Sequence, residues 1–206
     1  MTHREPVLEP VPVADLRPTQ ITVGFREVKE KRREWSERGA HSGEVFLGRH
    51  MIPVLLGPKR RPYVIDHHHL ARALHDEGVN EVAITVVADL SKLSKDEFWV
   101  LCDNKGWCHP YDAAGVRRDV DAIPKTIMKL VDDPYRSLAG ELRRQGGFAK
   151  DTTPFSEFIW ADFLRRRIKP DAVEKDFDKA MAKALALAKS PLAGHLPGWC
   201  GPIGAN

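Results

Sequence analysis

The chain contains few cysteines, no long apolar run and no strong excess of charge of one sign. Its 206 residues include only three cysteines. An odd number of cysteines at sparse spacing argues against a disulfide framework and is typical of a reducing compartment. No stretch approaches the ~20 apolar residues that a bilayer span needs, and the start, Met-Thr-His-Arg-Glu-Pro, lacks the apolar centre of a signal peptide. We therefore expect a cytoplasmic protein without a membrane partner.

The charge balance excludes a protein that is polycationic throughout. There are 32 basic and 29 acidic residues, which gives a formal net charge of +3. Basic residues nevertheless cluster locally, as in Lys31–Arg33, Lys59–Arg61 and Arg165–Arg167. If such clusters converge in space, they can follow a phosphate backbone without reading bases. The alternative is that they are solvated charges balanced by neighbouring carboxylates.

Chemistry-bearing residues are most concentrated between Tyr63 and Leu74. There a short apolar run ends in Asp66 and three consecutive histidines, and an alanine- and leucine-rich helical pattern follows. The first amides of a helix lack internal partners and attract anions such as phosphate, while imidazoles can hold anions, ligate metal or move protons. This segment therefore indicates phosphate or nucleotide handling. The alternative is a polar turn in which Asp66 only caps the helix.

The pattern along the chain divides it into an α+β module at 1–110, a helical extension at 111–193 and a flexible Gly/Pro-rich tail at 194–206. The module begins with a proline-containing edge segment at 6–18, and a loop is expected at 39–43. Its predicted strands are 51–56, 62–65 and a buried strand at 82–87. Its predicted helices are 23–38, one that follows the histidines and ends near Gly78, and 95–104. In the extension the predicted helices are 123–131, 138–144, 155–168 and 172–188.

The order strand, Asp-x-His-His, helix, glycine, strand resembles the ParB/sulfiredoxin fold, and more closely the ParB-like nuclease family. Asp66, His68, His69, Ala73 and Gly78 fall on the family pattern Asp-Gly-His-His-Arg-Leu and its closing glycine. The opening segment Val-Pro-Val-Ala-Asp-Leu-Arg-Pro-Thr-Gln is also similar to that of the family. The resemblance covers residues 7–110 and implies a small mixed-sheet module of the α+β class with an all-helical C-terminal extension.

Two positions depart from the family pattern. The glycine of the family is His67, and the arginine after the histidines is Leu70. In relatives the glycine lets the backbone approach phosphate and the arginine can hold it. His67 or Arg72 could compensate. Sulfiredoxin-type chemistry needs a cysteine in place of His68 and is excluded.

The resemblance implies chemistry at phosphorus, which requires a cation or metal beside the phosphate and a base for the attacking oxygen. Asp66 is the candidate ligand of a divalent metal, Mg²⁺ or Mn²⁺, and the expected nucleotide is ATP, ADP or CTP. The candidate catalytic residues are Asp66, His68, His69, Glu27 and Glu30. The candidate phosphate- or nucleotide-binding residues are Gln20, His67, His68, His69 and Arg72.

We expect a phosphate-directed enzyme of the ParB-like nuclease type, which cleaves or hydrolyses a phosphodiester or nucleotide with metal assistance. Its expected partner is a nucleotide or nucleic acid. One alternative is a nucleotide-dependent small-molecule kinase on the same fold, with Glu27 or Glu30 as the base. Another is a non-catalytic DNA- or protein-binding module with a degenerate pocket. The two glutamates could equally belong to a solvated helix face.

Overall fold

The computed structural model describes residues 10–49 and 51–202, with the backbone alone for residues 38–49. The chain separates into two compact units. The first unit comprises residues 1–23, 28–112 and 116–131, and the second comprises 24–27, 113–115 and 132–206. The sequence placed a boundary near residue 110, whereas the observed division keeps residues 116–131 with the first unit.

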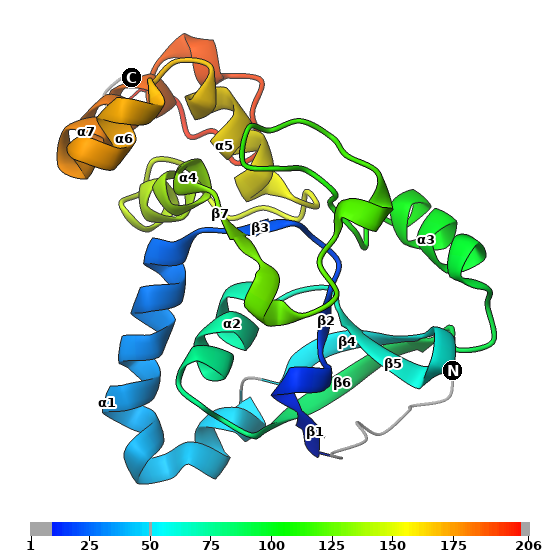
Figure 1. The fold of residues 1–206 in the computed structure, drawn as a ribbon. Helices are drawn as coiled ribbons and strands as arrows, with labels where there is room; N and C mark the ends of the chain where they lie inside the picture. The colour runs from blue at the N-terminus through cyan, green and yellow to red at the C-terminus, as the bar shows by residue number, and fades with distance from the viewer. Residues whose placement is uncertain (1–9, 50, 203–206) are drawn as a thin grey trace. The chain divides into compact units, whose positions relative to one another are not determined.

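The first unit is built on a mixed five-stranded sheet in the order β1-β6-β4-β5-β2 (Figure 1). Its strands are β1 (Pro10–Pro12), β2 (Arg17–Pro18), β4 (Ile52–Gly57), β5 (Arg61–Val64) and β6 (Glu81–Asp89). The pairs β1–β6 and β4–β5 are antiparallel, and the pairs β4–β6 and β5–β2 are parallel. The short proline-containing β1 lies at the sheet edge, as predicted, where a missing N–H donor is tolerated.

Three helices belong wholly or mostly to the first unit: α1 (Phe25–Arg49), α2 (His68–Asp76) and α3 (Lys95–Asn104). The bounds predicted for α3 are confirmed. Ser94 and Glu97 form a capping box that fixes the start of this helix. The predicted loop at 39–43 is wrong, since α1 continues to Arg49. The short turns η1 (Val13–Asp15), η2 (Pro58–Arg60), η3 (Val120–Ala122) and η4 (Ile127–Lys129) complete this unit.

Alternation along the strands divides the apolar side chains between two faces of the sheet. Val54 and Val64 pack in one cluster with Leu70 and Leu74 of α2. The neighbouring Leu55 and Tyr63 pack in another cluster with Phe98 and Trp99 of α3. A period of two sends successive side chains to opposite faces, so α2 and α3 cover different faces of the same sheet. Along the chain α2 follows β5 closely, so the start of α2 lies near the end of this strand.

The prediction of a buried strand at 82–87 is only partly correct. Val82 and Ile84 are buried, but Val87 is 49% exposed. The register between β4 and β6 shifts after Val54, and Val87 is left outside the ladder of paired residues. A bulge of this kind changes the direction in which the side chain of the extra residue points.

The second unit is helical, with α4 (Pro134–Arg144), α5 (Ser156–Arg165), α6 (Pro170–Lys175), α7 (Phe177–Ala188) and the turn η5 (Pro191–Ala193). Leu138, Leu142, Trp160 and Leu164 are fully buried in its core. The predicted helix at 172–188 is interrupted at Asp176. This residue leaves helical geometry and caps α7 by accepting a hydrogen bond from Lys179 N at 3.0 Å.

The tail from Gly194, predicted to be flexible, is anchored over its described part, which ends at Pro202. Leu196 is buried, Trp160 Nε1 donates to Pro197 O at 2.8 Å, and Ala149 N donates to Gly198 O at 2.7 Å. Among the described residues, no helix combines the length and apolar character required to cross a bilayer.

The predicted helix at 123–131 is wrong. Only the turn η4 is helical there, and it is followed by the two-residue strand β7 (Val131–Asp132), which pairs with β3 (Thr22–Val23). Arg72 of α2 holds this segment, because its Nη1 donates to the carbonyls of Met128 and Leu130 at 3.0 and 3.1 Å. Contacts from elsewhere in the fold override the local helical pattern.

The three cysteines should differ strongly in reactivity. Burial raises the pKa of Cys102 to about 12 and that of Cys108 to about 11, whereas Cys200 is exposed. Because these pKa values lie well above 8, both buried thiols stay protonated at pH 8. Only the thiolate is nucleophilic, so neither should react. We expect one thiol per chain to react with an aromatic disulfide reagent in the native protein and three in urea. Rapid reaction of two or three native thiols would contradict this assignment.

Candidate functional site

The predicted site lies where β5 passes into α2, and Thr19 ties this junction together. Thr19 Oγ1 donates to Val64 O at 2.7 Å, and Thr19 N donates to His68 Nε2 at 3.2 Å. Thr19 O in turn accepts a hydrogen bond from His109 N at 2.8 Å. Three segments that are distant in the sequence therefore meet at one buried threonine.

His68 is a buried structural acceptor at this junction, with 5% of its surface exposed. A backbone N–H can only donate, so Nε2 must be unprotonated, which assigns the ring proton of a neutral imidazole to Nδ1. Protonation of Nε2 would break the hydrogen bond from Thr19. The lone pair of Nε2 is thus used in a hydrogen bond within the fold.

Asp66 and His67 are the exposed residues of the junction. One oxygen of Asp66 accepts a hydrogen bond from His67 N at 2.7 Å. The N-cap of α2 is His67, not Asp66, and the His67 side chain makes no capping hydrogen bond. The prediction that Asp66 is the N-cap residue of α2 is therefore wrong.

His67 has a left-handed backbone, with φ of +62°. This conformation costs a non-glycine residue about 1–2 kcal/mol, which explains why a glycine belongs here in the family pattern. The turn keeps its geometry in this chain although the residue has changed.

His69 and Gln20 lie close to this junction in the fold. His69 is the second residue of α2 and is half-buried. Gln20 is buried and forms an isolated parallel bridge with His109, whose ring stacks on Tyr111 at a centroid distance of 4.2 Å. His109 was not among the predicted site residues. The sequence signal that could have found it is the break Gly-Trp-Cys-His-Pro at 106–110.

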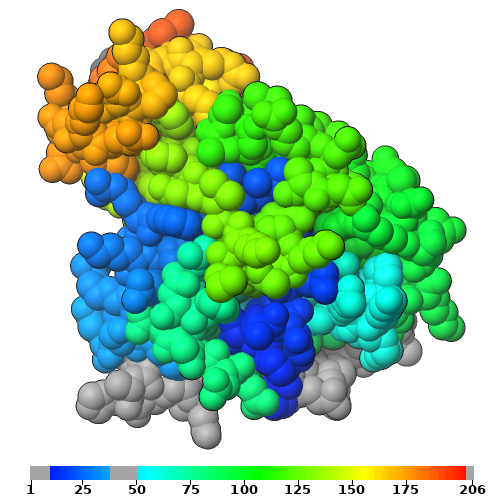
Figure 2. Space-filling model, in the orientation of Figure 1, coloured from blue at the N-terminus to red at the C-terminus, as the bar shows by residue number. Residues whose placement is uncertain are grey.

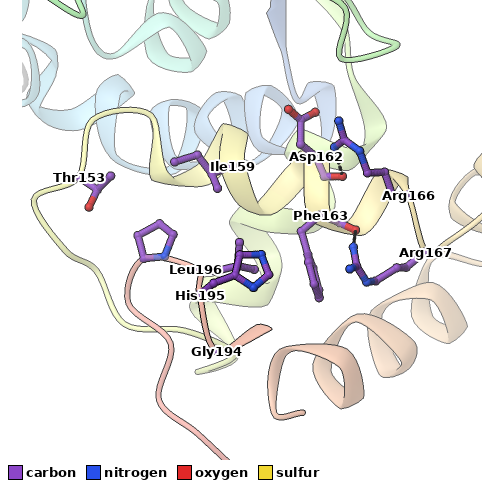
Figure 3. Close-up of a pocket in the computed structure, with 10 residues that line it drawn as sticks. Thr153, Ile159, Asp162, Phe163, Arg166, Arg167, Gly194, His195 and Leu196 are labelled. Atoms are coloured by element: carbon purple, nitrogen blue, oxygen red, sulfur yellow. Dashed lines mark hydrogen bonds between the residues drawn. The ribbon is translucent and has the colours of Figure 1, made fainter. Parts of the chain in front are cut away.

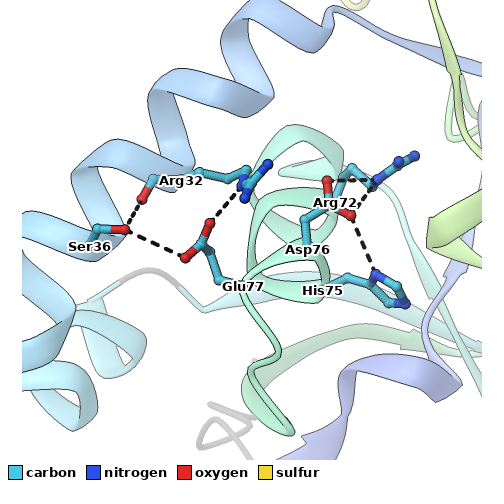
Figure 4. Close-up of polar contacts among 6 residues, drawn as sticks. All are labelled: Arg32, Ser36, Arg72, His75, Asp76 and Glu77. Carbon is cyan, nitrogen blue, oxygen red and sulfur yellow. Dashed lines mark hydrogen bonds and ion pairs between the residues drawn. The ribbon is translucent and has the colours of Figure 1, made fainter.

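Arg72, a predicted phosphate ligand, is engaged inside the first unit. Besides the two carbonyls described above, its Nε contacts both oxygens of Asp76 at 2.9 and 3.1 Å. Figure 4 shows Arg72 and His75 converging on Asp76, while Arg32 of α1 reaches Glu77 at 2.6 Å. Arg72 would have to leave these acceptors to hold phosphate.

The structure does not place the two predicted glutamates with Asp66 in one described site. Glu27 belongs to the second unit, where the pKa of Glu157 is raised by burial and by the charge of Glu27. Glu30 belongs to the first unit and lies on α1, 3.5 Å from Arg33. The junction itself therefore offers one exposed carboxylate, that of Asp66.

The described residues include no group of three or more His, Cys, Asp or Glu side chains that could hold a metal ion. The junction therefore does not fit a metal held by protein ligands alone, although Mg²⁺ often binds through one or two carboxylates and substrate phosphates.

The second unit contains a buried cluster of charges that the sequence analysis missed. Asp133, 1% exposed, pairs with Arg165 at 2.5 Å and caps α4 by accepting from Tyr135 N at 3.0 Å. Arg136 is 4% exposed, burial lowers its pKa, and its guanidinium lies 3.5 Å over the ring of Phe158. Buried charges of this kind persist only when they are paired.

A pocket of about 700 Å³ in the second unit lies between α5 and the segment Gly194–Pro197 (Figure 3). Its two arginines are engaged with their own helix turn: Arg166 donates to Asp162 O and Arg167 donates to Phe163 O. His195 lies against Phe163, with a centroid distance of 6.2 Å between the rings. None of the residues predicted from the sequence lines this pocket.

The fold and the junction define a mixed α/β protein in which an Asp-x-His-His turn enters a helix. A family model described as "Putative ParB-like nuclease" matches residues 9–166. This is more than half of the chain, and the chain belongs to the ParB-like nuclease family. The resemblance drawn from the motif is confirmed, and the match continues past residue 110 into the helical part.

A solved structure supports the same fold assignment. The crystal structure of protein Atu1540 from Agrobacterium tumefaciens is 56% identical in sequence, with a TM-score of 0.90. The similarity covers 96% of this chain and 98% of that chain. A search of curated proteins gave no match.

Proposed function

We propose that this protein binds the phosphate groups of a nucleotide or nucleic acid at the β5–α2 junction, Asp66–His69. The observation that carries the proposal is the left-handed backbone of the exposed His67 at the N-cap of α2, whose own side chain makes no capping hydrogen bond. A helix amino terminus carries a partial positive charge, and its outward amides suit phosphate oxygens. The exposed His67 and half-buried His69 add imidazoles that can donate to the same anion.

Cleavage of the phosphate ester, the activity that the family description suggests, would need a proton acceptor in addition. Asp66 is the exposed carboxylate of the junction and His69 is a half-buried imidazole, so these two residues are the candidates. His68 is a poor candidate because its Nε2 accepts from Thr19. Binding is therefore the function that this geometry supports best, and no observation favours a kinase.

The proposed location is the cytoplasm. All three cysteines are free thiols in the structure, and free thiols persist in a reducing compartment.

The test compares two nearly isosteric substitutions at the same exposed position. Titration calorimetry with ATP, CTP and GTP, and with a short oligonucleotide, is run on the wild type, His67→Asn and His67→Asp. Asparagine and aspartate both tolerate the left-handed region better than most residues, so both variants should fold. A carboxylate at the helix start repels phosphate, and we expect His67→Asp to bind at least tenfold more weakly than His67→Asn.

Equal affinities for the two variants, or no binding of any of these ligands by the wild type, would overturn the proposal. Incubation of the oligonucleotide with wild-type protein and Mg²⁺ or Mn²⁺ then tests cleavage separately. Loss of that cleavage in Asp66→Asn with binding retained would assign Asp66 to the chemical step.

A further inference from the structure

Residues 65–67 form a short link between β5 and α2, and one buried threonine holds both ends of this link. Thr19 Oγ1 donates to the carbonyl of Val64, the residue before the link, at 2.7 Å. Thr19 N donates to Nε2 of His68, the residue after the link, at 3.2 Å. Thr19 is 1% exposed, so solvent is excluded from it. Two hydrogen bonds of a single residue therefore fix the two ends of the link relative to each other.

Thr19 is itself held by contacts with other parts of the first unit. Its carbonyl accepts a hydrogen bond from His109 N at 2.8 Å. Earlier in the chain, Val13 and Leu16 pack in one cluster with Leu70 of α2. Figure 2 shows the dark blue surface of this N-terminal segment beside the teal surface of α2. The segment that carries Thr19 is therefore anchored on α2, and Thr19 has a fixed position from which it can hold the link.

The link contains a strained residue. His67 has φ of +62°, a left-handed conformation that glycine adopts without steric cost and that other residues disfavour. A residue keeps such a conformation only where the surrounding structure imposes it. The hydrogen bonds of Thr19 act on both sides of His67, at Val64 and at His68. They restrict the backbone of the link and so help to keep His67 left-handed.

We propose that Thr19 is the positioning residue of the phosphate site, because it holds Val64 and His68 so that the first amides of α2 face the ligand. This inference rests on the proposed function of the junction. Thr19 is buried and acts through the link, without contact to the ligand. Recognition of phosphate by helix amides depends on the direction of their N–H groups. A change at Thr19 should therefore weaken binding although every group that contacts the ligand is still present.

Thr19→Val tests the proposal, because valine is also β-branched but has no hydroxyl that could donate to Val64. Thr19→Ser is the conservative variant and restores a hydroxyl. The matched control is Thr22→Val in the same unit. Thr22 is also 1% exposed, but its Oγ1 has no hydrogen-bond partner among the described residues. The two valine substitutions thus differ in whether they remove a hydrogen bond at the link.

Titration calorimetry with ATP, CTP, GTP and the short oligonucleotide measures the affinity of each variant. We expect Thr19→Val to bind at least about fivefold more weakly than the wild type, which corresponds to the loss of one hydrogen bond. Thr19→Ser and Thr22→Val should each stay within about twofold of the wild type, since neither removes the hydrogen bond to Val64.

A second background separates positioning of the link from a general loss of structure. In His67→Gly the left-handed strain is absent, so the link needs less support from Thr19. His67→Gly removes an imidazole and lowers the affinity by itself. When Thr19→Val is added to this background, we expect a further loss of less than about twofold, because the two positions are coupled. The fall in Tm that Thr19→Val causes should also be smaller there, by at least about 2 °C.

The outcomes distinguish the role of Thr19 from the proposed function itself. If Thr19→Val weakened binding equally in both backgrounds, or no more than Thr22→Val does, the role of Thr19 would be overturned while phosphate binding at the junction would stand. If the wild type bound none of the four ligands, the proposed function would fail, and the inference would fail with it.

Discussion

Replacement of His68 by alanine is expected to destabilise the first unit by about 2–4 kcal/mol. The substitution leaves the buried N–H of Thr19 without its acceptor, which costs about 1–3 kcal/mol. It also empties the space of a ring that is 5% exposed at the start of α2. A cavity in a core adds to the loss of the hydrogen bond. Urea titration of the free energy of unfolding provides the measurement.

A substitution of the adjacent His67 provides a control, because it should not lower the free energy of unfolding. His67 is exposed and left-handed, so His67→Gly should leave stability unchanged or raise it, because glycine adopts positive φ without steric cost. Two neighbouring histidines of the same motif should thus respond differently. If the His68→Ala variant retained wild-type stability but lost nucleotide binding, His68 would contribute to ligand binding and not to the stability of the fold.

The motif could be predicted from the sequence because its signals are local. Alternation in the strands, the Asp-x-His-His turn and the glycine at position 78 all occur within about 20 residues, and the structure has β5, α2 and β6 in that order. The bounds predicted for α3 are likewise correct, and the capping box that the structure shows at its start is a local interaction. Short-range chemistry of this kind can be recognised without a structure.

What the sequence did not predict depends on contacts between distant residues. His68 and Thr19 are 49 positions apart, and the hydrogen bond between them makes the histidine a buried acceptor. Arg72 and Leu130 are 58 positions apart, and their contact holds the turn and short strand that are found where a helix was predicted. Glu27 was predicted to be catalytic because it follows the turn at 18–20 that resembles the opening segment of the family, yet it packs against Gly140 of α4, where a Cβ would lie 2.8 Å from its carboxylate. Local patterns carry no information on such partners.

Substitution of the buried Asp133 is expected to produce the other large loss of stability, in the second unit. Asp133→Ala should destabilise this unit by about 2–4 kcal/mol, because it removes the cap of α4 and the buried one of the two carboxylates that pair with Arg165, leaving only Asp162. Tyr135 N loses its acceptor, and capping alone contributes about 1 kcal/mol. Asp133→Asn retains a side-chain oxygen for that N–H but not the charge, so its loss should be smaller by roughly this amount.

A double-substitution cycle isolates the ion pair between Asp133 and Arg165. Breaking a buried pair by removal of one partner leaves an uncompensated charge, whereas replacement of both partners by apolar groups is often close to neutral. Asp133→Ala combined with Arg165→Met should therefore be less unstable than the sum of the two single variants by at least about 1 kcal/mol. Hydrogen exchange of the α4 and α5 amides localises the effect to the second unit. Additive single effects would contradict the coupling, and the stability of α4 would then depend on the cap of Asp133 alone.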